Sequence, residues 1–138
     1  MSNRRRVDAF FYGLFMDIDV LRKSGVKPVN IRRASVPNCA LRIGQRATLI
    51  TSPGARAYGM VMSLSHEDLA RLYGAPGLES YRPEAVLAQT LDGVLTAALC
   101  YNLIEAPGPD ERNPEYAIRL QGVLRKLDFP SEYVESLA

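Results

Sequence analysis

The fold is decided by a short apolar stretch near the start of the chain, VDAFFYGLFM at residues 7–16. Its β-branched and aromatic residues favour a core strand over residues 7–13, and the closing glycine permits a sharp turn. Beyond that turn, residues 16–24 carry apolar side chains on one side and are followed by Gly25, which is a helix-stopping residue. We therefore expect a strand, a tight turn and a short helix.

Three or four strands are predicted downstream of this helix. Residues 29–41 mix β-branched with polar residues and are interrupted by Pro37, so they indicate one bent strand or two edge strands. Residues 47–51 and 57–64 are predicted as separate strands, because the Ser-Pro-Gly at residues 52–54 favours a turn between them.

A helix is predicted to start at Ser65, whose hydroxyl can accept a hydrogen bond from the amide of Asp68. Residues 75–77, Ala-Pro-Gly, end that helix in a loop. The Asp92-Gly93 pair is the strongest short-range hairpin signal in the chain.

Two strands, over residues 84–91 and 94–104, are predicted to flank this hairpin turn. Apolar spacing then indicates helices over residues 115–127 and 130–137. Because regular alternation of strands and helices is missing, the predicted fold class is α+β with mainly antiparallel pairing.

The length and composition are those of one domain. With 138 residues, of which 47% are hydrophobic, the chain can bury a core, and we expect a single domain over residues 7–138. Residues 1–6 contain three arginines and are predicted to form a flexible basic tail. No apolar stretch is long enough to span a membrane, so we expect a cytoplasmic protein. A dispersed net charge of +2 argues against a nucleic-acid partner.

Cysteine and histidine chemistry is sparse. Cys39 and Cys100 are far apart in apolar stretches, and we expect both to be reduced, buried and inert. His66, the only histidine, follows Ser65 directly, and such neighbours on a helix do not face each other as a catalytic dyad. The sequence therefore predicts no metal site and no cofactor.

Three pieces of sequence, in this order, resemble the gamma-glutamylcyclotransferase-like family, and the likeness runs from residue 7 nearly to the C-terminus. The first is FYGLFM at residues 11–16, which is similar to the family's tyrosine-glycine loop after its first strand. The second is AYGMV at residues 57–61, which leads through Leu64 and Ser65 into Leu69. The third contains Tyr116, Gly122, Phe129, Pro130 and Tyr133.

This resemblance implies a small mixed, mainly antiparallel β-barrel with flanking helices and a pocket at its mouth. It implies that the loop after the first strand contributes five substrate contacts: Tyr12, Gly13, Leu14, Phe15 and Met16. In the family, the amino group of a gamma-glutamyl compound attacks the side-chain carbonyl of the same molecule, which makes 5-oxoproline and releases an amine. One glutamate usually transfers both protons.

The family's glutamate is replaced in this chain. Its motif falls on residues 69–74, with Tyr73 at the glutamate position. The later tyrosine of the motif is Tyr81, which the resemblance implies is a further substrate contact. An ordinary phenol ionises near pH 10, so only about one molecule in a thousand would offer a base at pH 7. Glu79, in the same loop, is either a replacement for this base or a solvent-exposed loop acid. Glu84 is expected to be a strand-edge charge.

Three functional hypotheses stay open. The first is an enzyme that cyclises a gamma-glutamyl amino acid or amine with Glu79 or an activated Tyr73. The second is a catalytically impaired member that binds a gamma-glutamyl compound or another small carboxylate. The third is a vestigial pocket with an exposed edge strand near residues 32–38 that binds a partner. The first two require the Tyr12 turn to meet the Tyr73 segment at the barrel mouth, and the oligomeric state is open.

Overall fold

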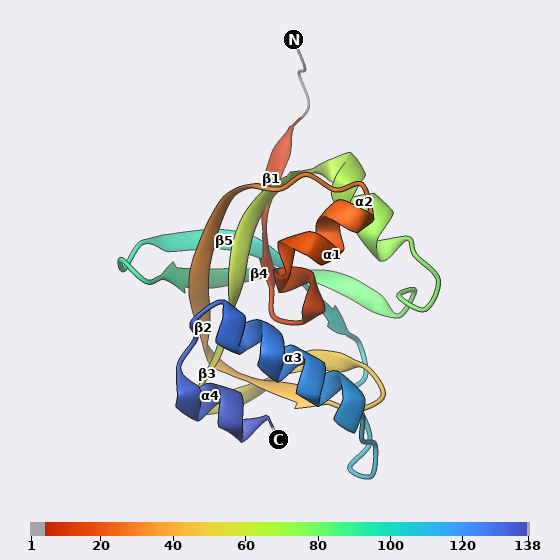
Figure 1. Cartoon of the computed structure of the whole chain (residues 1–138), viewed down its shortest axis with the longest axis vertical. Coiled ribbons are helices and arrows are strands. Elements are labelled where there is room, and N and C mark those ends of the chain that lie inside the picture. The colour runs from red at the N-terminus through yellow and green to blue at the C-terminus, as the bar shows by residue number, and fades with distance from the viewer. Residues whose placement is uncertain (1–4, 138) are drawn as a thin grey trace.

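The computed structural model describes residues 5–137, in which the strands close into a barrel flanked by helices (Figure 1). The strands are β1 (Arg6–Phe11), β2 (Val29–Ile43), β3 (Ala47–Ser65), β4 (Tyr81–Thr90) and β5 (Leu95–Leu103). The helices are the short 3₁₀ helix η1 (Leu14–Met16), α1 (Ile18–Lys23), α2 (His66–Tyr73), α3 (Pro114–Lys126) and α4 (Ser131–Ser136). The predicted α+β class is confirmed.

The barrel is closed in the order β1-β3-β2-β4-β5. Its neighbours pair antiparallel except β1 and β5, which are parallel and meet at Ala9 and Leu99. The β2–β4 seam is short, because the register joins only Ala34 with Thr90 and Ser35 with Gln89. The barrel is therefore mixed and mainly antiparallel, as the resemblance implied.

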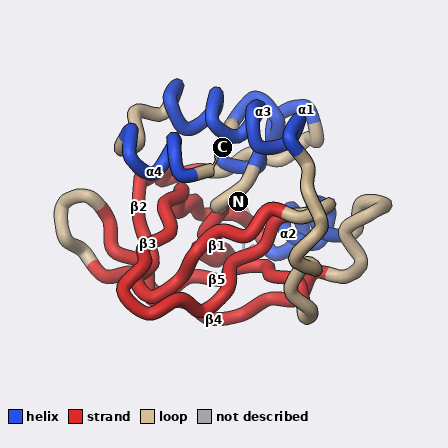
Figure 2. Tube along the Cα trace, turned by 90° about the horizontal axis from the view of Figure 1, so that it is seen from below, coloured by secondary structure: helices blue, strands red, loops and turns tan. Residues whose placement is uncertain are grey.

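Strand alternation divides the core into two parts. Phe10 and Val61 belong to the cluster inside the barrel, whereas Phe11 and Met62 belong to a second cluster, which includes buried residues of the helices. Figure 2 shows α1, α3 and α4 as one layer over the barrel, with α2 apart from them beside the strands. The chain following β1 thus lies between the barrel and this helical layer.

The prediction of a turn that separates two strands at residues 52–54 is wrong. β3 continues as one strand, and its register with β2 shifts between Pro37 and Cys39. At this point Asn38 and Gly54 have φ values of 59° and 83°, and Asn38 Oδ1 accepts a hydrogen bond from the Gly54 amide at 3.0 Å. The turn-forming residues make a bulge because β2 bends with β3 and keeps its backbone paired.

The first helix begins later than residue 16. The Asp17 side chain caps α1 by accepting a hydrogen bond from the Asp19 amide at 3.0 Å, and Met16 belongs to η1. β1 begins at Arg6, inside the predicted tail, and an Arg6 guanidinium nitrogen donates to the Ser63 carbonyl at 2.8 Å. Residues 1–4 lie outside the described part of the chain, so a flexible tail there stays a prediction.

Both cysteines lie in strands as free thiols. Cys100 is buried and Cys39 is half-buried, and burial raises the pKa of both thiols. The expectation of full burial is therefore correct for Cys100 only. Across residues 5–137, the helices are too short or too polar to cross a membrane. The cytoplasmic location stays a prediction.

Candidate functional site

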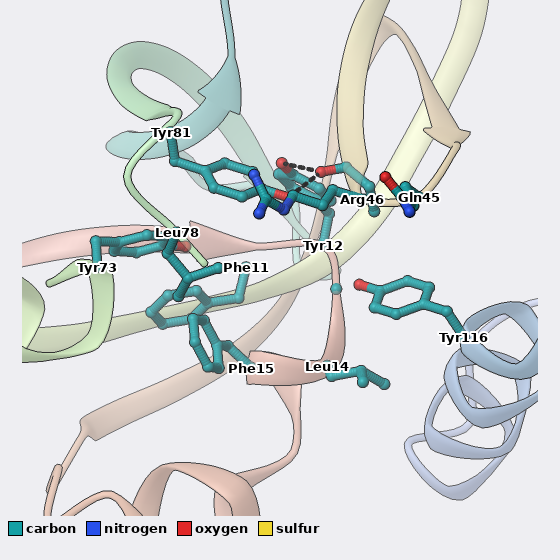
Figure 3. A pocket seen from close by; sticks show the side chains of 12 residues that line it. Phe11, Tyr12, Leu14, Phe15, Gln45, Arg46, Tyr73, Leu78, Tyr81 and Tyr116 are labelled. Atoms are coloured by element: carbon teal, nitrogen blue, oxygen red, sulfur yellow. Dashed lines mark hydrogen bonds between the residues drawn. The ribbon is translucent and has the colours of Figure 1, made fainter. Parts of the chain in front are cut away.

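A cavity of about 310 Å³ opens where the turn after β1 meets the end of α2. Its lining is mostly aromatic and consists of Phe11, Tyr12, Gly13, Leu14, Phe15, Gln45, Arg46, Ala47, Tyr73, Leu78, Tyr81 and Tyr116. Figure 3 shows these side chains around the space that we call the aromatic cavity. The expectation that the Tyr12 turn and the Tyr73 segment meet is confirmed.

Tyr12 is fixed at the base of the cavity by backbone contacts. It directly follows β1, and its hydroxyl donates to the Tyr101 carbonyl at 2.7 Å and lies 3.4 Å from the Ala47 carbonyl. Burial raises the pKa of Tyr12 well above its usual value. The hydroxyl is therefore neutral, and its proton is already used in a hydrogen bond within the protein.

Gly13 allows Tyr116 to come close to the turn. A Cβ atom at Gly13 would lie 2.5 Å from the Tyr116 hydroxyl oxygen, so a larger residue does not fit without a shift. Tyr116 stands in the first turn of α3, where the Asn113 side chain caps the helix by accepting from the Tyr116 amide at 3.1 Å. In Figure 3 the hydroxyl points toward the cavity, and burial raises its pKa.

Met16 differs from the other residues of the predicted loop. Leu14 and Phe15 line the cavity together with Tyr12 and Gly13, whereas the Met16 side chain is 0% exposed and packs in the core beneath the helices. A direct ligand contact by Met16 is therefore corrected to a packing role, because η1 turns this side chain away from the cavity.

Tyr73 is the last residue of α2 and lies among other rings. Its ring stacks on Tyr101 with centroids 3.8 Å apart and meets the Phe15 ring edge-on at 5.6 Å. Burial raises the pKa of Tyr73 well above its usual value, and neighbouring tyrosines add to this effect. At neutral pH the phenol is therefore protonated, and it can donate a hydrogen bond but cannot remove a proton.

Tyr81 and Arg46 form the opposite side of the cavity. The Tyr81 hydroxyl donates to the Ala47 carbonyl at 2.6 Å, and burial raises its pKa to about 12 against the opposing effect of the Arg46 charge. Arg46 is exposed and reaches from the β2–β3 turn across the cavity toward Tyr81 (Figure 3). Among the lining residues that the structure describes, Arg46 is the only one with a charge.

Glu79 does not line the aromatic cavity. It is exposed, its Oε1 accepts a hydrogen bond from the Gly77 amide at 3.2 Å, and backbone hydrogen bonds lower the pKa of its carboxyl. It borders a neighbouring, more polar hollow of about 580 Å³ that shares Gln45 and Arg46 with the cavity. The expectation that Glu79 could reach the reacting groups is therefore not met in this arrangement. Glu84 is exposed and pairs with Cys100 in the sheet, away from the cavity lining.

Nothing in the sequence marks Gln45, Arg46 or Leu78 as site residues, and Tyr116 stands out only as part of the family likeness. A signal for Gln45 and Arg46 was nevertheless present, since they lie with Gly44 between two predicted strands. A hairpin turn at this point must lie at one end of the barrel. Which end cannot be read from the turn itself. Within residues 5–137, His, Cys, Asp and Glu side chains do not gather in threes as a metal site would require.

Solved structures share this fold. A gamma-glutamyl cyclotransferase aligns over 96% of this chain and 86% of its own, with a TM-score of 0.77 and 20% identity. YkqA from Bacillus subtilis aligns over 97% of this chain with a TM-score of 0.78 and 22% identity, but this chain spans only 53% of that protein. An AIG2-like protein from Mus musculus aligns over 80% of this chain and 90% of its own, with a TM-score of 0.57 and 15% identity.

No protein-family model and no curated protein sequence matches the chain. At identities this low, the likeness to solved structures establishes the fold alone. The fold implied by the sequence resemblance is therefore confirmed, and the activity has to be argued from the cavity.

Proposed function

We propose that this chain, which has the gamma-glutamyl cyclotransferase fold, binds a small carboxylate-bearing ligand in the aromatic cavity and does not cyclise gamma-glutamyl compounds at a useful rate. One observation carries the proposal: among the described residues that line the cavity, none is a carboxylate or a histidine. The sequence resemblance assigns the family's glutamate to position 73, which is a tyrosine in this chain. The cavity thus has groups that can bind a ligand, whereas a group that could transfer protons is missing from its described lining.

The lack of a base is a large energetic deficit for cyclisation. The reaction needs a group that removes a proton from an ammonium and returns one to the leaving nitrogen. A phenol with the ordinary pKa near 10 is already unfavourable as a base at pH 7 by about 4 kcal/mol. Burial raises the pKa of Tyr73 further, so its deficit is larger than that of an ordinary phenol.

The groups that remain suit an anion or a carbonyl oxygen. Arg46 supplies a positive charge, and the neutral hydroxyls of Tyr73 and Tyr116 supply donors. The structure shows the Tyr73 hydroxyl in no hydrogen bond with residues 5–137, and its raised pKa arises from burial and neighbouring groups, so the hydroxyl is available to a ligand. A carboxylate can therefore replace its lost water contacts with these groups.

A cyclotransferase is the second candidate function. The structural likeness to a solved gamma-glutamyl cyclotransferase over 96% of this chain favours it. It would require the loop between α2 and β4 to carry Glu79 from the polar hollow into the aromatic cavity, with loss of the Gly77 amide contact.

The experiment measures turnover and binding on the same preparation. Incubation with a panel of gamma-glutamyl amino acids and amines is expected to release no 5-oxoproline above the buffer control, whereas calorimetry with small carboxylates is expected to show binding. Leu78→Trp, which fills part of the cavity, should abolish that binding. Ile118→Trp should leave it unchanged, because Ile118 is 68% exposed on α3 and does not line the cavity.

Release of 5-oxoproline that Glu79→Gln abolishes would overturn the proposal in favour of the cyclotransferase. Carboxylate binding that survives Leu78→Trp would place the ligand outside the aromatic cavity and contradict the proposal as well.

A further inference from the structure

The charges around the aromatic cavity favour carboxylates that have no ammonium group over carboxylates that carry one. Its described lining contains one cation, Arg46, and no Asp or Glu. A gamma-glutamyl group with a free amino group carries an ammonium beside its carboxylate. Burial of an ammonium without an anionic partner is strongly unfavourable, and the Arg46 charge at the same mouth adds repulsion. A ligand that has no ammonium avoids both penalties.

The walls of the cavity suit a flat apolar group. The rings of Phe11 and Phe15 meet edge-on with centroids 5.9 Å apart, and Phe15 meets Tyr73 in the same way at 5.6 Å. The hydroxyls of Tyr12 and Tyr81 donate to backbone carbonyls, so neither hydroxyl proton is left for a ligand. Rings arranged in this way favour an aromatic ligand, which they can contact at a face or an edge.

The size of the cavity limits the ligand to one ring and a short chain. Its volume of about 310 Å³ lies at the lower end of the range for small-molecule sites, roughly 300–1,000 Å³. Larger molecules would have to extend past Gln45 and Arg46 into the polar hollow, which both residues also border.

Arg46 is placed to hold the acidic end of such a ligand. Its side chain is exposed, and within residues 5–137 its guanidinium takes part in no hydrogen bond or salt bridge, although its charge helps to lower the pKa of the Glu79 carboxyl. Figure 3 shows it above the aromatic walls, on the Tyr81 side of the cavity. A guanidinium with free donors binds a carboxylate through two parallel hydrogen bonds.

We propose that the natural ligand is a small aromatic or similarly flat carboxylic acid without an amino group, with its ring between Phe15, Tyr73 and Tyr81 and its carboxylate on Arg46. This inference rests on the proposed binding function and narrows it. An aromatic cage can also attract an ammonium through its ring faces. Here Arg46 opposes that mode, and the test includes it.

The test compares ligands that share one skeleton. Hydrocinnamate is phenylalanine without its ammonium, phenylpropanol lacks the carboxylate, and phenylethylamine carries only the ammonium. Calorimetry is expected to show hydrocinnamate binding at least roughly tenfold more tightly than each of the other three, because one lost charge contact is worth about that much.

Two arginine variants separate the anchor from general surface charge. Arg46→Gln is expected to weaken hydrocinnamate at least roughly tenfold and to leave phenylpropanol unchanged. Arg125→Gln, at an exposed position of α3 outside the cavity, should change neither affinity. A melting temperature equal to that of the unaltered chain shows that each variant is folded.

The inference is overturned if phenylalanine or phenylethylamine binds as tightly as hydrocinnamate, or if Arg46→Gln has no effect on the acid. The proposed binding function survives either result, provided that a carboxylate still binds in a way that Leu78→Trp abolishes. If no carboxylate binds at all, both the inference and the proposed function are wrong.

Discussion

Replacing Tyr73 with glutamate is expected to give a chain that releases 5-oxoproline from gamma-glutamyl compounds. The new carboxylate would stand at the end of α2 on the wall of the aromatic cavity, at the position that the sequence resemblance assigns to the family's glutamate. It would also give a substrate ammonium the anionic partner that the unaltered cavity lacks. A positioned general base is worth a factor of roughly a hundred or more, so release should rise at least that far above the unaltered chain.

Tyr73→Gln is the matched control for this substitution, because glutamine has the size of glutamate and cannot accept the proton. Both variants lose the stacking of Tyr73 on Tyr101, which contributes about 1 kcal/mol to stability. Chromatographic quantification of 5-oxoproline compares the two at equal concentrations of folded protein. Equal release by the glutamate and glutamine variants would contradict the assignment of position 73 as the missing base.

Replacing Gly59 with alanine is expected to destabilise the barrel by about 3 kcal/mol. Gly59 lies in β3 opposite Ala34 of β2, where β1 and β3 come close together. A Cβ atom there would overlap the carbonyl oxygen of Phe11 and lie 2.8 Å from the Phe10 ring. The carbonyl belongs to the backbone just before the Tyr12 turn, so it cannot move aside without distorting the cavity. Denaturant unfolding followed by circular dichroism measures the loss.

Gly122→Ala provides the control in the opposite direction. Gly122 lies inside α3, and a Cβ atom at this position would meet no atom within 4 Å. Alanine in a helix interior is favoured over glycine by about 1 kcal/mol, so this variant should be more stable than the unaltered chain. If the two alanine variants unfold at the same denaturant concentration, the close approach at Gly59 does not limit the fold.

Local signals predicted the elements whose geometry depends on adjacent residues. The Ser65 side chain accepts a hydrogen bond from the Asp68 amide at 3.1 Å, as its position before an acidic helix start indicated. Gly93 has a φ of 87° in the turn between β4 and β5, as the Asp-Gly pair predicted. The prediction of a closed barrel rested on the family resemblance, because no local pattern specifies that β1 pairs with β5.

Features that depend on distant partners could not be predicted in this way. Residues 52–54 look like a turn in isolation, and only the bend in β2 at Asn38 makes them a bulge. The direction of Glu79 is set by the Gly77 amide of its own loop, so its spacing from Tyr73 says nothing of where its carboxylate points. Arg46 enters the site because the register of β2 with β3 carries their turn to the cavity.

The protonation state of Tyr73 is the measurement that bears most directly on the central claim, that the cavity offers no base. Nuclear magnetic resonance of protein labelled at the tyrosine ring carbon that bears the hydroxyl reports it, and the Tyr73→Phe spectrum identifies the resonance. We predict that Tyr73 stays protonated from pH 7 to above about 10, since burial raises its pKa. A resonance that titrates near neutral pH would reveal an activated phenolate in the cavity and contradict the account.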